Sequence, residues 1–333
     1  MPVIKNIVFW LGNARHGALP HSILPAVLSL CMAYGSGGFS TLLGALALIG
    51  VVLGHLGINL LDDYFDYKQK SATVRARLAH RGIRARIGKC NYLVSNEATL
   101  RQLLGVIVSL LMLAMLCGAV ILFYRGRVIF YIAAAAAIIG ASYSGGPLKL
   151  SYRGLGGVAI LFLFGPLLMS GVYYSAAGSL DVSVIFLSIS TGLLVVNAGH
   201  VHDIMDYEPD IEVGKMTLAV LLGSRRSMLV ALMVILTCIY GSIVAGVIWG
   251  YLSLIYLSVL VTLPLAISLF WLMVQFVRDP HREYLPAFWM GPIPKWAIMQ
   301  EAGVGWFMIR WFLARNLQTA ILLILITCSL LAK

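Results

Sequence analysis

Long apolar runs separated by short polar segments recur from one end of the chain to the other. Each run is roughly 17–25 residues long, the length that an α-helix needs to cross the hydrocarbon core of a bilayer. The pattern predicts nine transmembrane helices, at about residues 19–35, 40–61, 99–123, 127–144, 155–177, 183–203, 226–248, 251–277 and 312–332. We therefore expect an all-α polytopic membrane protein in which residues 1–333 form a single transmembrane domain.

The composition excludes a soluble globular protein. Of the 333 residues, 60% are hydrophobic and only 11% are charged, whereas soluble domains carry about 25% charged residues. The five cysteines show no paired spacing, which indicates small packing residues and not a disulfide framework or a zinc site.

Basic residues are concentrated in alternate polar segments. Nine of the 24 Lys and Arg residues lie between Lys68 and Arg101, and others follow the predicted helices that end near residues 144, 203 and 277. Because Lys and Arg accumulate on the cytoplasmic side, we expect a cytoplasmic N-terminus and a C-terminus outside. Two long cytoplasmic loops, at about 67–97 and 278–311, would then cap the bundle. The same bias accounts for most of the net charge of +11, so nucleic acid is not an expected partner.

The N-terminal segment gives no indication of processing. Residues 1–15 lack the apolar core and the small-residue cleavage site of a signal peptide. The first predicted helix, at 19–35, is therefore expected to direct insertion into the membrane.

Acidic residues are scarce, and most of them gather at two predicted helix ends. Eight of the 13 lie within 59–66 and 203–212, where helices 40–61 and 183–203 reach the cytoplasmic side. Carboxylates are costly near hydrocarbon, so such clusters indicate a functional site with a positive partner. The two segments are four helices apart, which predicts two parallel four-helix halves followed by a ninth helix.

Helical spacing places the members of each cluster on one face. Asn59, Asp63 and Asp66 are spaced i, i+4, i+7, whereas the second cluster repeats the pattern at i, i+3, i+7. Together two such faces could supply about six oxygen ligands, which Mg²⁺ prefers and supplements with water and phosphate oxygens. We therefore predict a pair of Mg²⁺ ions and a diphosphate ligand, with the metal bound by Asn59, Asp62, Asp63, Asp66, Asp203, Asp206 and Asp210. Asp62 lies about 100° from the first face, and Glu208 and Glu212, off the second face, are expected to be solvated.

Several basic residues near the clusters are candidates for binding the diphosphate. They are Lys68, Lys70, Arg84, Arg86 and Lys215, and Asn59 is a further polar candidate. Segment 74–87 has the pattern of a short amphipathic cationic helix. It would either lie on anionic headgroups or close over an anionic substrate.

Helix 127–144 ends in a Gly-Pro turn that carries Tyr143 and Lys149. The glycines and Pro147 would end the helix and bring its backbone close to a cavity. Tyr143 could stabilise a cation through its ring face, and Lys149 could meet a phosphate. An ordinary turn with an interfacial tyrosine and lysine is the alternative.

The two acidic segments resemble the paired aspartate-rich motifs of the UbiA-type intramembrane prenyltransferases. The second motif, from Asp203 to Asp210, is complete, whereas the first carries Asp62 where Asn is usual and Lys70 at the last Asp position. Three further stretches, YSGGPLKLSYRGLGG at 143–157, Phe164-Gly165 and GKMTLAVLLG at 214–223, look like the 1,4-dihydroxy-2-naphthoate branch of menaquinone biosynthesis. Gly157 and the loop 75–90 depart from that branch.

The resemblance implies a nine-helix enzyme of a bacterial or archaeal cell membrane with a cytoplasmic active site. It would transfer a polyprenyl group from a polyprenyl diphosphate to an aromatic quinone precursor, through an allylic carbocation and with Mg²⁺. We assign the catalytic roles to Asp63, Asp66, Asp206, Asp210, Tyr143 and Lys149. Hydroxybenzoate, a tetrapyrrole or a glycerol-phosphate lipid are the alternative acceptors.

Two other classes of membrane protein fit the sequence less well. A transporter would place its charges near the bilayer midplane, whereas both clusters lie at predicted helix ends. A CDP-alcohol phosphotransferase would carry a DGxxAR pattern, which the sequence lacks.

Overall fold

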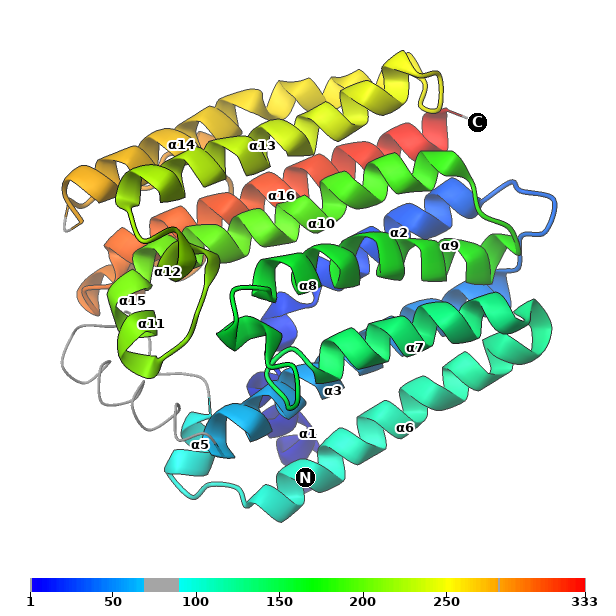
Figure 1. Ribbon diagram of the computed structural model, residues 1–333, viewed down its shortest axis with the longest axis horizontal. Helices are drawn as coiled ribbons and strands as arrows, with labels where there is room; N and C mark the ends of the chain where they lie inside the picture. The colour runs from blue at the N-terminus through cyan, green and yellow to red at the C-terminus, as the bar shows by residue number, and fades with distance from the viewer. Residues whose placement is uncertain (1, 69–89, 281, 333) are drawn as a thin grey trace.

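The computed structural model describes residues 2–68, 90–280 and 282–332, and it is a bundle of long helices whose axes lie roughly parallel (Figure 1). The first half comprises α1 (Pro2–Asn13), η1 (His16–Ala18), α2 (Pro20–Ala33), α3 (Thr41–Lys68), α5 (Asn91–Val94), α6 (Leu100–Arg125) and α7 (Arg127–Ala141). The chain then continues through η2 (Leu150–Tyr152), α8 (Gly156–Phe162), η3 (Leu163–Leu167), α9 (Leu168–Ala177), α10 (Val182–Met205) and α11 (Tyr207–Val213). The last part comprises α12 (Leu218–Leu222), α13 (Arg225–Ile248), η4 (Leu254–Thr262), α14 (Leu263–Arg278), η5 (Phe288–Met290), α15 (Trp296–Glu301) and α16 (Gly305–Leu331).

Within the described part of the chain, seven helical segments are long and apolar enough to cross a membrane. Two of them are composite, because α8, η3 and α9 form one rod and η4 continues into α14. The shorter apolar helices α2 and α7 occupy the two remaining positions where the sequence predicts spans. The all-helical membrane class is therefore confirmed, and the count of nine spans stays a prediction.

Two helices differ from the sequence prediction. The predicted last span begins at 312, but α16 begins seven residues earlier, at Gly305. The polar side chain of Arg310 obscured these turns in the sequence, yet it is fully buried, with its Nε 3.2 Å from the Leu272 carbonyl oxygen and its guanidinium 5.2 Å from the Phe276 ring centroid. The N-terminal helix α1 was not predicted. Its Phe9 and Trp10 pack edge-to-face against Tyr92 near the end of α3.

The two predicted halves pack in a corresponding way. Helix α3 packs most extensively on the following α6, and α10 packs most extensively on the following α13. Both acidic helix ends lie at the same end of the bundle, on the left in Figure 1, beside α5, α11 and α12. This common end is the feature of the fold that positions the site.

Proline residues break two of the rods. Proline lacks an N–H, and its ring clashes with the carbonyl four residues earlier. Accordingly α8 ends at Phe162, four residues before Pro166, and gives way to a π-helical turn. In the same way α10 ends at Met205, four residues before Pro209. The second break lies inside the second acidic cluster.

Small residues allow the broken rod to approach α10 closely. A Cβ added to Gly165 would lie 2.3 Å from the Ser188 carbonyl oxygen, and one added to Gly192 would lie 2.4 Å from the Leu161 carbonyl oxygen. Neither contact is possible for a real side chain. The two glycines therefore fix how closely α10 packs against η3, as small residues do at helix crossings in membranes.

Candidate active site

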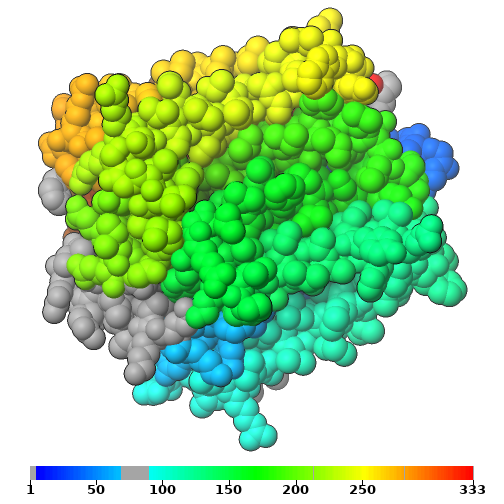
Figure 2. Space-filling view, in the orientation of Figure 1, coloured from blue at the N-terminus to red at the C-terminus, as the bar shows by residue number. Residues whose placement is uncertain are grey.

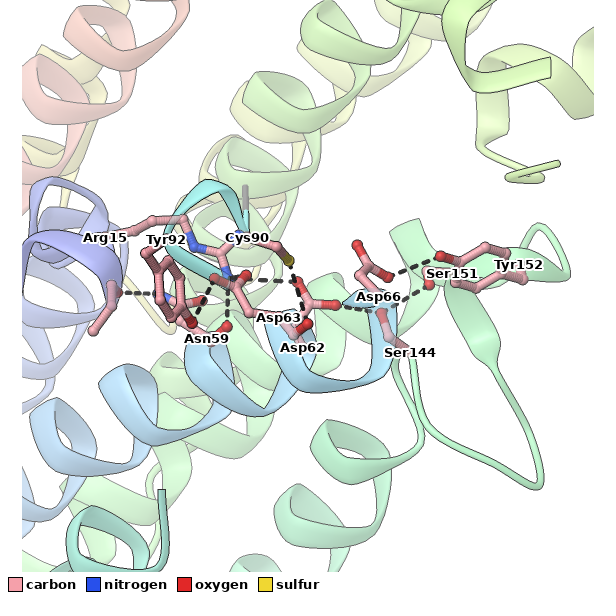
Figure 3. Close-up of polar contacts among 11 residues, drawn as sticks. Arg15, Asn59, Asp62, Asp63, Asp66, Cys90, Tyr92, Ser144, Ser151 and Tyr152 are labelled. Atoms are coloured by element: carbon pink, nitrogen blue, oxygen red, sulfur yellow. Dashed lines mark hydrogen bonds and ion pairs between the residues drawn. The ribbon is translucent and has the colours of Figure 1, made fainter. Parts of the chain in front are cut away.

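The first acidic cluster occupies the last turns of α3. Asp63 and Asp66 are each 1% exposed, although both are carboxylates. Arg15, from the turn between α1 and η1, reaches across to this cluster (Figure 3). Its Nη2 lies 3.2 Å from Asp63 Oδ1 and 3.5 Å from Asp62 Oδ2, and it donates a hydrogen bond of 2.6 Å to the Asn59 carbonyl oxygen. The buried charge of Asp63 thus has a cationic partner from the turn between α1 and η1.

The surroundings hold these groups in defined protonation states. Burial disfavours the charged form of Arg15, but the nearby carboxylates of Asp63 and Asp62 outweigh this effect and raise the pKa of its guanidinium. Burial, together with the Asp63 carboxylate, raises the pKa of the Tyr92 phenol. Tyr92 therefore remains protonated and donates a hydrogen bond of 3.3 Å to Asp63 Oδ2. The Cys90 thiol donates to the Asp63 carbonyl oxygen at 3.2 Å.

The segment that joins α7 to α8 and includes the first turn of α8, residues 142–157, supplies partners for the other two carboxylates. The Ser144 hydroxyl donates a hydrogen bond to Asp62 Oδ1, and Tyr152 donates one of 2.8 Å to Asp66 Oδ1 (Figure 3). The Ser144 and Ser151 hydroxyl oxygens lie 3.2 Å apart. This segment is therefore a structural part of the first cluster.

The second acidic cluster spans the break between α10 and α11. Asp203 lies on α10, Asp206 is the residue between the two helices, and Asp210 lies on α11. The sequence placed all three on one continuous helix face, which is wrong in detail because Pro209 interrupts the helix. Asp206 and Asp210 are nevertheless each 2% exposed.

Two contacts of Asp206 lie within α10 and α11. The amide of Asp210 still donates to the Asp206 carbonyl oxygen at 2.8 Å, and His202 Nδ1 lies 3.6 Å from Asp206 Oδ2. Glu208 and Glu212 are exposed, as expected. The Glu208 carboxylate lies 3.4 Å from Arg225 Nη2 at the surface.

Segment 142–157 also reaches the second cluster. Its residues Tyr143 and Ser151 line a cavity together with Asp203 and Lys215. The Gly154 amide donates a hydrogen bond of 2.9 Å to the Met216 carbonyl oxygen, which ties the segment to the connection between α11 and α12. In Figure 2 the segment and α8 lie directly beside these elements on the visible face. One segment thus contacts the first cluster and forms a wall of the cavity beside the second.

The predicted diphosphate-binding residues are only partly placed. Lys215 lines the cavity, whereas the exposed Lys68 lies 4.9 Å from the ring centroid of Tyr64 on its own helix. The Asn59 side-chain amide donates a hydrogen bond of 3.0 Å to the Ala14 carbonyl oxygen. Lys149 is exposed, and among the described residues no contact joins its side chain to either cluster. Lys70, Arg84, Arg86 and the predicted helix 74–87 lie outside the described residues.

The donor set of the two clusters suits a hard cation. Four buried carboxylates at one end of the bundle provide the oxygen donors that Mg²⁺ prefers. Among the residues that the structure describes, no three His, Cys, Asp or Glu side chains are arranged so that they could hold a metal ion. The metal ligands predicted from the sequence therefore stay a prediction.

Four residues of this site were missed or left without a role by the sequence reasoning. Arg15, Tyr92, Ser144 and Tyr152 all contact the first acidic cluster. The predicted topology offered a signal for Arg15. A residue just before the first predicted span lies on the same side of the membrane as the end of the second predicted span, where the first acidic cluster stands. Ser144 and Tyr152 stood within the Gly-Pro turn motif, but spacing alone did not show which hydroxyls point toward carboxylates.

The fold and this site define a polytopic helical membrane enzyme with buried carboxylates at one end of its bundle. The UbiA prenyltransferase family matches residues 22–293, and the chain belongs to that family. It is a prenyltransferase.

Several curated relatives of this chain are named as prenyltransferases of naphthoate or naphthoquinone compounds. The chain is 28% identical to 1,4-dihydroxy-2-naphthoate octaprenyltransferase of Escherichia coli over 269 residues, which cover 78% of this chain and 84% of the relative. It is 26% identical to the enzyme of the same name from Haemophilus influenzae, over 67% of this chain and 71% of the relative. A 2-carboxy-1,4-naphthoquinone phytyltransferase from Synechocystis is 28% identical, over 65% of this chain and 66% of the relative.

Solved structures share the fold at lower identity. A digeranylgeranylglyceryl phosphate synthase aligns with a TM-score of 0.63 and 16% identity, covering 98% of this chain and 99% of the other. A UbiA homologue from Archaeoglobus fulgidus, solved with GPP and Mg²⁺, aligns with a TM-score of 0.59 and 15% identity, covering 92% and 99%. At these identities the likeness supports the fold alone.

Proposed function

We propose that the protein transfers a polyprenyl group from a polyprenyl diphosphate to an aromatic quinone precursor such as 1,4-dihydroxy-2-naphthoate. The observation that supports this most directly is the connection of two buried carboxylate clusters through segment 142–157. The names of the curated relatives support the naphthoate acceptor. In this proposal nine helices span the membrane, and the active site faces the cytoplasm beneath the loops 67–97 and 278–311.

The two acidic clusters would hold two Mg²⁺ ions. One cluster would supply the ligands Asn59, Asp62, Asp63 and Asp66, and the other cluster would supply Asp203, Asp206 and Asp210. When bound, the ions would neutralise charge on the diphosphate and so stabilise it as a leaving group.

The chain's own cations and aromatic rings would assist the departure of the diphosphate. Lys215, together with Lys68, Lys70, Arg84, Arg86 and the Asn59 amide, would bind its oxygens. The C1–O bond of the prenyl diphosphate would break with its electron pair passing to the diphosphate, which leaves an allylic cation. Tyr143 would stabilise that cation through its ring face, and Lys149 would meet a phosphate. Preorganised charges of this kind usually supply the largest part of a rate enhancement.

The acceptor ring would then form the new bond. A ring carbon attacks C1 of the allylic cation, and a proton, or CO₂ from a naphthoate, leaves the same carbon to restore aromaticity. The apolar surroundings of the bundle would keep water from the cation and accommodate the prenyl tail within reach of lipid.

A transfer assay tests this proposal. Purified protein in detergent is given Mg²⁺, one labelled polyprenyl diphosphate and a panel of acceptors: 1,4-dihydroxy-2-naphthoate, 4-hydroxybenzoate, a chlorophyllide and a glycerol-phosphate ether. We expect a prenylated naphthoate by mass and no product when EDTA replaces Mg²⁺. Prenylation of another acceptor alone would reassign the substrate. Transport of a substrate without pyrophosphate release would contradict the class.

A further inference from the structure

A groove runs between α1 and the first turns of α6. On α1 the lining residues are Asn6, Phe9 and Trp10, at spacings i, i+3 and i+4. On α6 the groove follows one helical face from Gln102 to Leu110. Its volume is about 610 Å³, and clefts that bind small molecules have volumes of about 300–1,000 Å³. The groove is therefore large enough for part of a lipid molecule.

The α6 side of the groove is exposed to lipid. Helix α6 is the least buried of the seven helical segments that could cross a membrane, with 11% of its apolar stretch buried. Gln102 and Leu110 are eight residues apart, which is about 12 Å along a helix, and one leaflet of hydrocarbon is about 15 Å thick. An acyl chain that followed the groove from the start of α6 would thus cross most of one leaflet.

Polar groups gather where the groove meets the start of α6. Among the described residues that line the groove, Glu97 alone is ionisable, and it is exposed. The Ser95 hydroxyl donates a hydrogen bond of 2.7 Å to Glu97 Oε1, which orients the carboxylate and leaves acceptor capacity on its other oxygen. The Gln102 amide oxygen accepts a hydrogen bond of 2.9 Å from the Thr99 backbone N–H, so the amide nitrogen faces away from that bond as a donor. This end of the groove thus offers a carboxylate to a cation and amide hydrogens to an anion.

The aromatic wall of the groove also contacts the first acidic cluster. The ring centroids of Phe9 and Trp10 lie 6.1 Å and 5.9 Å from that of Tyr92. Tyr92 in turn donates a hydrogen bond of 3.3 Å to Asp63 Oδ2. Arg15, the cationic partner of Asp63, follows closely after the end of α1. A molecule bound in the groove would therefore stabilise the helix and the ring that hold two partners of Asp63.

We propose that this groove binds a phospholipid whose headgroup carries a primary ammonium, such as phosphatidylethanolamine. The ammonium pairs with the Glu97 carboxylate, and the phosphate accepts hydrogen bonds from the amides of Asn6 and Gln102. One acyl chain lies along α6 over Val106 and Leu110. A choline headgroup has no N–H to donate to the carboxylate, and an anionic glycerol headgroup offers it no cation. Neither the substrates nor Mg²⁺ of the proposed prenyl transfer are needed for this binding.

A lipid titration tests the choice of headgroup. The purified protein is delipidated in detergent and titrated, without Mg²⁺ or substrates, with phosphatidylethanolamine, phosphatidylcholine or phosphatidylglycerol of identical acyl chains. Native mass spectrometry measures the bound lipid. We expect phosphatidylethanolamine to bind about threefold more tightly than the other two, a modest factor because Glu97 is exposed. The net charge of +11 would by itself favour the anionic phosphatidylglycerol. Equal affinities for the three lipids, or a preference for phosphatidylglycerol, would overturn the proposal.

A charge variant tests the role of Glu97. Glu97→Gln keeps the size of the side chain and removes its charge, so the preference for phosphatidylethanolamine should disappear. Glu301→Gln, at an exposed carboxylate that ends α15, is the matched control and should keep the preference. A preference that survives in Glu97→Gln would overturn the proposal.

A steric variant tests the path of the acyl chain. Gly105 lines the groove, and a Cβ built there meets no atom within 4 Å, so a leucine would fill the groove without a clash at Cβ. Gly118, further along the same helix, has equally free surroundings and is the matched control. We expect Gly105→Leu to weaken phosphatidylethanolamine binding about fivefold relative to Gly118→Leu, since the new side chain displaces one or two methylene groups of the lipid. Equal affinities in the two variants would show that the lipid binds elsewhere and would overturn the proposal.

The contact of the groove wall with Tyr92 gives a second readout. Phosphatidylethanolamine should raise the melting temperature of the unaltered protein and of Gly118→Leu, because the bound lipid fastens α1 to α6. The increase should be smaller in Gly105→Leu. Equal increases in all three proteins would overturn the proposal. Prenyl transfer is absent from both measurements, so a failed transfer assay would remove the proposed function and leave the lipid site standing.

Discussion

At the scale of single residues, the buried carboxylates of Asp63, Asp66, Asp206 and Asp210 are the main departure from ordinary packing in a membrane bundle. A charge that is removed from water is retained only where partners compensate for it. We therefore expect Asp63→Asn and Asp206→Asn to abolish prenyl transfer, a loss of about 10³-fold or more if each stabilises the departing diphosphate. Both variants should remain folded, with a cooperative melting transition in a thermal shift assay.

Glu212→Gln is the control for these two substitutions. Glu212 is exposed on α11, two residues from the buried Asp210, so the same loss of charge should leave turnover unchanged. Near-normal turnover in both Asp variants would show that the acidic clusters take no part in prenyl transfer.

Arg15 is the countercharge of the first cluster in this structure. Its guanidinium lies 3.2 Å from Asp63 Oδ1, but its own side chain is 37% exposed, so solvent screens part of the attraction. Without added metal, Arg15→Gln should reduce the free energy of unfolding by about 1–3 kcal/mol, less than for a fully buried pair. Arg278→Gln, at the exposed last residue of α14, is the control. An unchanged stability in Arg15→Gln would mean that other groups neutralise Asp63.

At the scale of elements, the tight crossing of α10 with η3 holds the second cluster beside segment 142–157. A side chain at Gly192 has no room, because its Cβ would lie 2.4 Å from the Leu161 carbonyl oxygen. Gly192→Val should therefore cost at least about 1–3 kcal/mol of stability, as overpacked cores do, and should lower the melting temperature. Gly241→Val, where the Cβ meets nothing within 4 Å, should leave it unchanged. A stable Gly192→Val would show that α10 can shift away from η3.

The sequence predicts the positions of the long helices better than the contacts between them. Apolar runs and helical spacing suffice for the long helices and for the common face of Asn59, Asp63 and Asp66, because both depend only on local geometry. The break at Met205 was also readable, since Pro209 stands four residues later. The contacts of Arg15, Tyr92 and Tyr152 depend on how helices far apart in the chain pack together. Periodicity carries no information on that packing.

At the scale of the whole molecule, both acidic helix ends lie at one end of the bundle (Figure 1). From the positive-inside rule we predict that this end faces the cytoplasm. In inverted membrane vesicles, a cysteine introduced at the exposed Glu212 should react with a membrane-impermeant maleimide, and one introduced at Asp181, at the opposite end of α10, should not. The starting chain has its own five cysteines replaced by serine or alanine. If only the cysteine at position 181 reacted, the protein would have the opposite orientation in the membrane.

The proposed prenyl transfer requires both acidic clusters to act in one reaction. The most direct measurement is the formation of prenylated 1,4-dihydroxy-2-naphthoate, followed by mass, as Mg²⁺ is titrated into the purified unaltered protein, Asp63→Asn and Asp206→Asn. We expect Mg²⁺-dependent product from the unaltered protein and none from either variant, since each variant lacks a carboxylate of one cluster. Full product from either variant, or product that forms without a divalent cation, would contradict the proposal.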